Sequence, residues 1–425
     1  MRVSIPRGAD YLALATGESR ILRLRFSEPP ATAIARLPAF EPGSPQRVLL
    51  LGANGFIGIN MLRALLDDDR VEGVTVLVRA KTSRGIRDRV LATARRFHVT
   101  LPNVHKLVVL EGDYTQPDFG LAPADYGQLQ RAIGAVVHAA GSTLYAPYLH
   151  HRGQGLVPML RLIEFCLEGR VKRLEVIGSA ASAAFTRRRD FFKFDLFHSG
   201  YPRNKWVTHQ VAVEAHRRGV PVTMCLAPYV MGGPKTDFHD PGGRYIAYRM
   251  YSYLREIGKI YDSDVQLPCA PADCVADAVV ENLFSPDPRT VYYPYMPFTA
   301  RDAARLFGWQ PVPMPEFIAA LRRTYPLNSP GRLRTLLKPS AATQLQIKRA
   351  LILRTLLNRR NEQALRTSVE HLLEIGRPVT LPGDMTPSDV IAACMRTNAP
   401  RSDKHLTRDI TSPAEPQPKF VGIRP

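Results

Sequence analysis

A tyrosine and a lysine four positions apart are the side chains in this sequence best suited to chemistry. Tyr201 and Lys205 open a predicted helix, and this spacing places both on one helical face. Lys205 can lower the pKa of the phenol and bind a ribose hydroxyl, while Tyr201 donates a proton to oxygen as hydride reaches carbon. Ser179 lies 22 positions earlier, at the end of a predicted strand, where its hydroxyl can bind the same oxygen. A Tyr-x-x-x-Lys pair also occurs by chance, so the elements around it must support this interpretation.

The strongest support is a glycine-rich turn upstream. Val48–Leu51 is an apolar strand, glycines follow at spacings of three, and Ile59–Leu66 continues as a helix. In a Rossmann turn the first glycine permits a tight bend, the second lets the backbone approach a pyrophosphate, and the third lets helix pack on strand. An ordinary glycine turn is the alternative. The residues predicted to contact a dinucleotide here are Gly52, Asn54, Gly55, Phe56, Ile57 and Gly58.

The residue after the second predicted strand indicates which dinucleotide is bound. An NAD-specific protein carries an acidic side chain there, for the 2′-hydroxyl of the ribose, whereas this chain has Arg79. A guanidinium suits a 2′-phosphate, so the sequence favours NADPH, with Lys81 and Arg84 as further cations. A solvated surface arginine is the alternative.

Two other strand ends complete the predicted cofactor site. Asp113 follows the third strand and could hold the adenine or order its own loop. Ala139 and Ala140 follow the fourth strand and place small side chains beneath the cofactor. His138, which precedes them, is interpreted as a packed core histidine. No metal site is predicted.

Alternating apolar strands and helices predict the element order that would bring these residues together. This order is typical of an α/β, Rossmann-type, doubly wound parallel sheet, which we expect to run to about residue 230. The predicted strands are Val48–Leu51, Val74–Val78, Leu107–Glu111, Ala135–His138, Arg173–Ile177 and Val222–Leu226.

The chain divides into five predicted regions. Residues 1–46 form an arm with a possible strand at Ser19–Phe26 and a proline-rich connector, 47–230 the NADP-binding domain, and 231–325 a smaller substrate subdomain with a helix at Asp273–Leu283. Residues 326–396 form a basic, mostly helical extension, and 397–425 a disordered tail. Within the extension, a helix is expected to end at Gly376 and another to begin at Thr386, capped with Asp389.

Composition narrows the class of protein. Of 425 residues 45% are hydrophobic and 22% charged, as in soluble globular proteins. No apolar run is long enough to span a membrane and no secretory signal is evident, so a cytoplasmic protein is expected. The five dispersed cysteines are interpreted as buried or incidental thiols. The net charge of +19 indicates an anionic partner.

Taken together, these motifs resemble the extended short-chain dehydrogenase/reductases. The closer similarity is to the thioester reductase domains of nonribosomal peptide synthetases and carboxylic acid reductases, relatives of fatty acyl-CoA reductases. It covers about residues 46–325 and rests on Leu49–Gly58, Leu77–Ala80, Gly112–Asp113, His138–Ala140, Gly200–Val207 and Pro271–Ala278. Ser179 stands where threonine is more usual, Gln154 where asparagine is usual, and Ala227–Pro228 replaces Arg-Pro.

The resemblance implies an NADPH-dependent reductase of an acyl thioester, giving an aldehyde or an alcohol, with Ser179, Tyr201 and Lys205 as its catalytic residues. The alternatives are an NAD(P)-dependent reductase or epimerase of a keto or sugar-nucleotide substrate, and a non-catalytic NADP-binding regulator. The implied partner is an acyl or peptidyl carrier protein. Residues 317–361 hold ten Lys or Arg and no Asp or Glu, so an acidic carrier could dock there; nucleic acid is a less favoured partner for the same charges.

Overall fold

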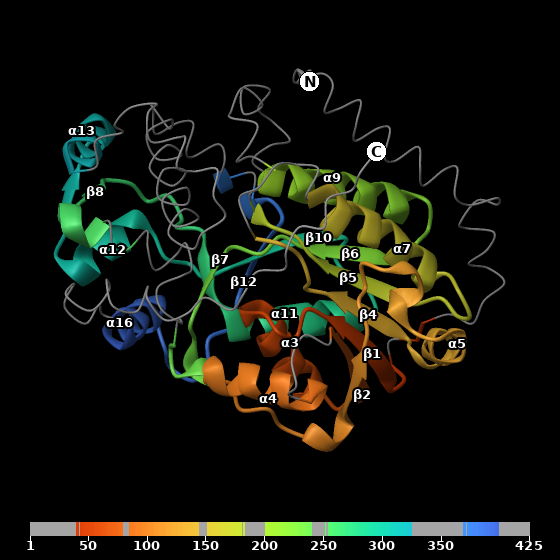
Figure 1. The fold of residues 1–425 in the computed structure, drawn as a ribbon. Helices are drawn as coiled ribbons and strands as arrows, with labels where there is room; N and C mark the ends of the chain where they lie inside the picture. The colour runs from red at the N-terminus through yellow and green to blue at the C-terminus, as the bar shows by residue number, and fades with distance from the viewer. Residues whose placement is uncertain are drawn as a thin grey trace, which may run out of the picture.

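A single parallel sheet of eight strands forms the centre of the protein (Figure 1). The computed structural model describes residues 40–41, 43–79, 85–143, 151–180, 182, 200–239, 251, 254–324, 369–370 and 372–398, without the side chains of 202 and 203. The strand order is β12-β10-β6-β5-β4-β1-β2-β3. The chain order therefore reverses between β1 and β4, as in a doubly wound fold that binds its ligand at this switch point.

The sheet strands are β1 (Gln46–Leu51), β2 (Val71–Val78), β3 (Leu107–Glu111), β4 (Ala135–His138), β5 (Arg173–Ile177), β6 (Val222–Cys225), β10 (Val291–Tyr295) and β12 (Gly376–Pro378). The helices on its faces are α3 (Phe56–Asp67), α4 (Ile86–Arg96), α5 (Pro123–Ala132), α7 (Val157–Cys166), α9 (Gly200–Arg217) and α11 (Ala272–Phe284).

Apolar side chains point alternately to the two faces of the sheet, and both faces are buried beneath helices. Val48 and Leu50 of β1 belong to one core cluster, and Leu49 and Leu51 to a second. Helices α3, α4 and α11 cover the first face and α5, α7 and α9 the second (Figure 1). A continuous apolar strand such as Val48–Leu51 fits only a sheet covered on both sides.

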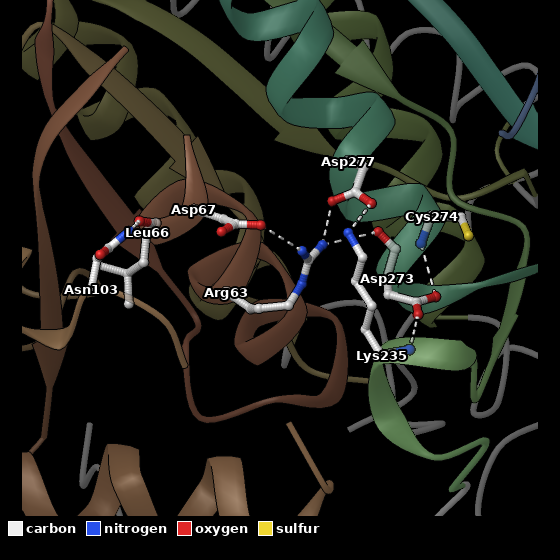
Figure 2. Close-up of polar contacts among 8 residues, drawn as sticks. All are labelled: Arg63, Leu66, Asp67, Asn103, Lys235, Asp273, Cys274 and Asp277. Atoms are coloured by element: carbon white, nitrogen blue, oxygen red, sulfur yellow. Dashed lines mark hydrogen bonds and ion pairs between the residues drawn. The ribbon is translucent and has the colours of Figure 1, made fainter. Parts of the chain in front are cut away.

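Helix α3 is attached to α11 by a buried arginine (Figure 2). Arg63 of α3 forms an ion pair with Asp277 of α11, and its side chain is only 5% exposed. Lys235, in the 3₁₀ turn Pro234–Thr236, binds the other oxygen of Asp277 at 3.0 Å. The backbone N–H of Lys235 donates to Asp273 at 2.7 Å, so two acidic residues of α11 hold both the helix and the turn.

A smaller subdomain lies beyond the β12 edge of the sheet (Figure 1). Two short parallel pairs of strands belong to this part of the chain. They are β7 (Tyr229–Met231) with β9 (Cys269–Pro271), and β8 (Lys259–Tyr261) with β11 (Gln310–Val312). Its helices are α12 (Ala300–Phe307), α13 (Met314–Thr324) and α16 (Pro387–Thr397).

The structure confirms the alternating strands and helices predicted as far as residue 226. The expectation that the sheet ends near residue 230 is wrong, because β10 pairs with β6, and β12 pairs with β10. Gly376, predicted to end a helix, begins β12. The helix predicted at Asp273–Leu283 is present as α11, but it packs on α3 and covers the main sheet. The cap predicted for α16 is confirmed, since Thr386 and Asp389 form a capping box.

Some predictions fall outside the described residues. These are the possible strand Ser19–Phe26, the cations Lys81 and Arg84, the tail from residue 399, and residues 325–361 of the basic segment. The five cysteines are all buried thiols, as expected. None of the helices in the described ranges combines the length and apolar content that a membrane crossing requires.

Candidate active site

The glycine turn between β1 and α3 can exist only with glycine at two of its three positions. Gly52 has a φ of +97°, and a Cβ there would lie 2.7 Å from the backbone of Ala139 and of Ala140. A Cβ on Gly58 would lie 1.9 Å from the carbonyl oxygen of Gly52. Gly55 is less constrained, since its Cβ would find only the Gly52 oxygen at 3.5 Å. The turn therefore brings α3, β1 and the end of β4 into direct backbone contact.

This turn leads into the start of α3 at the carboxyl edge of the sheet. Gly55 is the N-cap of α3 and, because it has no side chain, it supplies no capping hydrogen bond to the first turn. Such a helix start suits a phosphate because the N–H groups and the helix dipole both favour an anion. Phe56 is buried against Phe97, at 5.3 Å between ring centroids, so it can face a cofactor only through its backbone. Asn54 is exposed on the turn and Ile57 is partly buried.

The ends of β2 and β3 bring Arg79 and Asp113 together. Arg79 is more than half exposed, and its Nη1 lies 3.8 Å from Oδ2 of Asp113. The other carboxylate oxygen of Asp113 accepts hydrogen bonds from the backbone N–H of Thr115 at 3.0 Å and from its hydroxyl at 2.7 Å. Of its two predicted roles, ordering its own loop is thus the one with contacts in this structure. The Arg79 guanidinium thus remains largely exposed at the carboxyl end of β2.

Tyr201 and Ser179 meet as the sequence predicted. A side-chain hydrogen bond joins them, although burial of the phenol has the larger effect and raises the pKa of Tyr201 above its ordinary value. The nearby phenol of Tyr229 raises it further. The expectation that the phenol pKa is lowered is therefore wrong for this structure, because desolvation disfavours the phenolate. Tyr201 is held in its protonated form, as a proton donor must be.

Lys205 lies one helical turn after Tyr201 and points back to the strand that precedes Ser179. Its Nζ donates to the carbonyl oxygen of Ile177, the last residue of β5, at 3.0 Å. Burial lowers the pKa of Lys205 to about 8, which leaves most of the ammonium charged at neutral pH. The charge thus lies against the carboxyl end of β5, one helical turn from Tyr201.

The residues that follow β4 lie against the end of β1. The N–H of Ala139 donates to Leu51 at 3.0 Å, and Ala140 is partly buried beside it. Burial, with a smaller effect of the Lys205 charge, lowers the pKa of His138 to about 3. Its ring packs edge-on against Tyr114 at 5.5 Å. His138 is therefore a neutral, packed histidine, as the sequence analysis interpreted it.

Two side chains near Tyr201 were not predicted from the sequence. His151 is only 1% exposed, and its ring meets that of Tyr201 edge-on with centroids 6.2 Å apart. Tyr229, at the start of β7, is 36% exposed and close enough to affect the phenol. Neither belongs to a recognisable motif. The Tyr after Ala227–Pro228 was the one available signal, because it follows the carboxyl end of β6.

Comparisons with known proteins are consistent with this geometry. A family model described as male sterility protein, an NAD-binding family, matches residues 50–279. Among curated proteins, the nonribosomal peptide synthetase cpsA of Aspergillus campestris is 27% identical over 264 residues, which are 57% of this chain and 25% of the relative. The chain spans about a quarter of the length of the curated relatives it matches first.

Solved structures share the fold at lower identity. The terminal R domain from the myxalamid PKS-NRPS biosynthetic pathway aligns with a TM-score of 0.64 at 20% identity, covering 90% of this chain and 97% of that one. A thiolation-reductase di-domain from an archaeal non-ribosomal peptide synthetase aligns with a TM-score of 0.59 at 14% identity, covering 89% of this chain and 79% of that one. Both likenesses show the Rossmann-type architecture.

Proposed function

Because the chain belongs to the NAD-binding family described as male sterility protein, we propose that it is an NADPH-dependent reductase of an acyl thioester. The product is an aldehyde or, after a second reduction, an alcohol. The observation that carries the proposal is the contact between the protonated phenol of Tyr201 and Ser179, one helical turn from Lys205. The similarity to parts of nonribosomal peptide synthetases supports a thioester rather than a keto or sugar-nucleotide compound as the substrate.

The choice of NADPH over NADH rests on Arg79. The family and fold imply a nicotinamide dinucleotide. The glycine turn fits its pyrophosphate because Gly52 and Gly58 permit the close backbone packing of the turn, while Gly55 places no side chain at the start of α3. Arg79 offers a guanidinium where an NAD-binding protein would carry an acid. The Asp113 carboxylate lies 3.8 Å from the Arg79 guanidinium, which is too far for a hydrogen bond. A 2′-phosphate that accepts a direct hydrogen bond from Arg79 would therefore be a better partner than this carboxylate.

In the proposed mechanism each side chain acts on the thioester carbonyl. When bound, NADPH supplies the hydride that reaches the carbonyl carbon. Tyr201 and Ser179 hold the oxygen as negative charge develops there, and Tyr201 gives it a proton. The thiohemiacetal then collapses to the aldehyde: the C–S bond breaks, the hydroxyl gives up its proton as the carbonyl re-forms, and a proton reaches the departing sulfur, which leaves as the thiol. Lys205 binds the ribose and keeps positive charge near the phenol.

The acyl group is proposed to arrive on the phosphopantetheine of a carrier protein. The structural likeness to a thiolation-reductase di-domain supports a carrier rather than coenzyme A. The basic stretch 317–361 would attract an acidic carrier; only Phe317–Thr324 of it is described, as part of α13, with Arg322 and Arg323 exposed. A cytoplasmic location is part of the same proposal.

One experiment tests the reaction. The purified chain is incubated anaerobically with NADPH and a panel of acyl-pantetheine thioesters, while absorbance at the nicotinamide band, free thiol and aldehyde are followed together. We expect NADPH consumption matched by thiol release in the first reduction. NADPH loss on ketones but on no thioester would replace this proposal with a keto reductase, and tight NADPH binding without turnover of any substrate would indicate a regulator.

A further inference from the structure

The helix that carries Tyr201 and Lys205 places a third side chain on the same face. His209 lies one turn after Lys205, so that residues 201, 205 and 209 repeat at the helical spacing of four. All three contact the end of β5 and the turn that follows it. Tyr201 bonds to Ser179, Lys205 to the carbonyl of Ile177, and His209 approaches Ser182.

Ser182 connects His209 to the backbone of Ser179. Both the N–H and the hydroxyl of Ser182 donate to the carbonyl oxygen of Ser179, at 2.8 and 2.7 Å. Oγ of Ser182 is fully buried and lies 3.4 Å from Nδ1 of His209, which is itself 8% exposed. Since the Ser182 proton is directed at Ser179, the proton between Ser182 and His209 must come from Nδ1. The contact therefore requires the tautomer of His209 that carries its proton on Nδ1.

We propose that His209 is a positioning residue for the reaction, acting through Ser182 to hold Ser179 at hydrogen-bonding distance from Tyr201. The chain of donors runs from His209 Nδ1 to Ser182 Oγ and on to the Ser179 carbonyl. These hydrogen bonds fix the turn that carries the Ser179 hydroxyl. The first turn of α9 contacts this turn through Tyr201, and the third turn contacts it through His209. The kinetic consequence rests on the proposed reductase function, but the tautomer and the hydrogen bonds do not.

A positioning role predicts a loss in turnover without a loss in cofactor binding. A displacement of about 1 Å at a reacting group can cost about 10²-fold in rate. The His209 contact is long, so we expect roughly a tenfold fall in kcat for the thioester when it is removed by His209→Leu. The dissociation constant for NADPH, measured by fluorescence, should change less than twofold, because the glycine turn and Arg79 belong to other elements.

The asparagine and glutamine variants separate positioning from packing. The amide nitrogen of Asn can replace Nδ1 of histidine, whereas that of Gln replaces Nε2. His209→Asn should therefore keep kcat within about threefold of the wild type, while His209→Gln should resemble His209→Leu. Ser182→Ala should lower kcat as much as His209→Leu, and the double variant should be no slower than either. If the leucine variant does not fold, the Asn and Gln pair still decides the question.

A second histidine of the same helix provides the control. His216 lies near the C-terminal end of α9, where its ring contacts the hydroxyl of Thr290 at 3.1 Å. Because this contact does not involve Ser182 or Ser179, His216→Leu should leave kcat unchanged. Equal losses in His209→Asn and His209→Gln, or additive losses with Ser182→Ala, would overturn the proposal. So would a parallel fall in NADPH affinity.

The tautomer can be tested without any turnover. In ¹⁵N-histidine NMR of the whole chain, the signal missing from His209→Asn identifies His209 among the eleven histidines. We expect its shifts to show a proton on Nδ1, and Ser182→Ala to remove that preference. A proton on Nε2 in the wild type would sink the proposal even if the enzyme is active. An inactive wild type with the expected tautomer would instead contradict only the reductase function.

Discussion

The phenol of Tyr201 is suited to giving a proton rather than taking one. Burial is the largest effect on it and raises its pKa, while Ser179 opposes this by hydrogen bonding. Reduction of a carbonyl consumes a proton at oxygen, so a donor that stays protonated at neutral pH serves the reaction in that direction. At neutral pH the phenol is therefore in the protonation state that the proposed reduction requires.

Loss of the phenol hydroxyl should therefore act on rate. General acid catalysis typically contributes about 10²- to 10⁴-fold, and we expect Tyr201→Phe to lose turnover of that order. NADPH affinity should stay nearly constant, because the hydroxyl bonds to Ser179 in this structure and not to the glycine turn. Stopped-flow reduction and NADPH titration measure the two quantities. Near-normal turnover would remove Tyr201 from the mechanism.

The exposed guanidinium of Arg79 should decide between the two nicotinamide cofactors. A charged hydrogen bond contributes about 1.5–3 kcal/mol, or roughly 10- to 150-fold in affinity. Arg79→Ala should weaken NADPH binding by that factor and leave NADH binding unchanged, as measured by fluorescence titration of both. Arg47 is a matched control, since it is equally exposed but bound to Glu72 beside the amino end of β2. Equal weakening of NADPH and NADH would make Arg79 a structural residue.

At the scale of elements, long apolar strands were the predictable part of the fold. Leu107–Glu111, Ala135–His138 and Arg173–Ile177 appear with the predicted bounds. Each is a mostly apolar segment that lies between turn or helix signals in the sequence. The later strands have no such signal. β7, β8, β9, β11 and β12 have three residues each, and β10 contains Pro294 between tyrosines. Their pairing depends on neighbours distant in sequence, which periodicity cannot reveal.

The site was predictable where motif and element coincide. Ser179, Tyr201 and Lys205 come together because a strand end and a helix start each fix a side chain, and the structure has the first two hydrogen-bonded. The direction of the Tyr201 pKa shift was not predictable, because it depends on burial by surrounding elements. His151 and His209 were missed for the same reason, as each gains its meaning only from a packed neighbour.

The strand β5 carries a buried carboxyl group that should make stability depend on pH. Glu175 is fully buried, and burial raises its pKa to about 7 despite hydrogen bonds from Thr223, Asn282 and Tyr292. In an unfolded chain the same group has an ordinary pKa near 4.5. Below pH 7 the folded protein therefore holds Glu175 protonated, whereas above pH 7 it must bear a buried negative charge. The contribution of this group to stability falls as the pH rises from about 4.5 to about 7, because the folded state binds the proton more tightly than the unfolded chain.

Substitution by glutamine isolates this effect. Between pH 5 and pH 8 the wild type should lose roughly 2–3 kcal/mol of unfolding free energy relative to Glu175→Gln, at about 1.4 kcal/mol per pKa unit. Urea unfolding at both pH values measures it, and comparing the two proteins cancels the titration of every other group. Parallel pH profiles would mean that Glu175 stays ionised without cost.

At the scale of the whole molecule, the net charge of +19 bears on how a partner approaches. If residues 317–361 attract an acidic carrier protein, association should be faster at low salt, because exposed charges are screened over about 8 Å at physiological ionic strength. We expect kcat/KM for a carrier-bound acyl thioester to fall steeply with salt, and the same acyl group on free pantetheine to respond little.

Charge reversal provides the matching variant. Glutamate at Arg354, Arg359 and Arg360, which lie outside the described residues, should abolish the difference in salt response between the two substrates. If both substrates respond alike before and after the reversal, the basic segment does not dock a carrier. A lipid or nucleic-acid partner then becomes the better account of the charge.

The position of β12 has a consequence for how the protein is made. This strand pairs with β10 and so forms the edge of the sheet beyond it. In the sequence, however, α12, β11 and α13 lie between β10 and β12. During synthesis β10 must therefore wait with an open edge until the ribosome has produced Gly376–Pro378, and open edges invite pairing with other chains. We expect pulse-labelled hydrogen exchange to find the amides of Tyr293 and Val379, which bond across this edge, protected after those of β1 and β4. Simultaneous protection would mean that the sheet forms in one step.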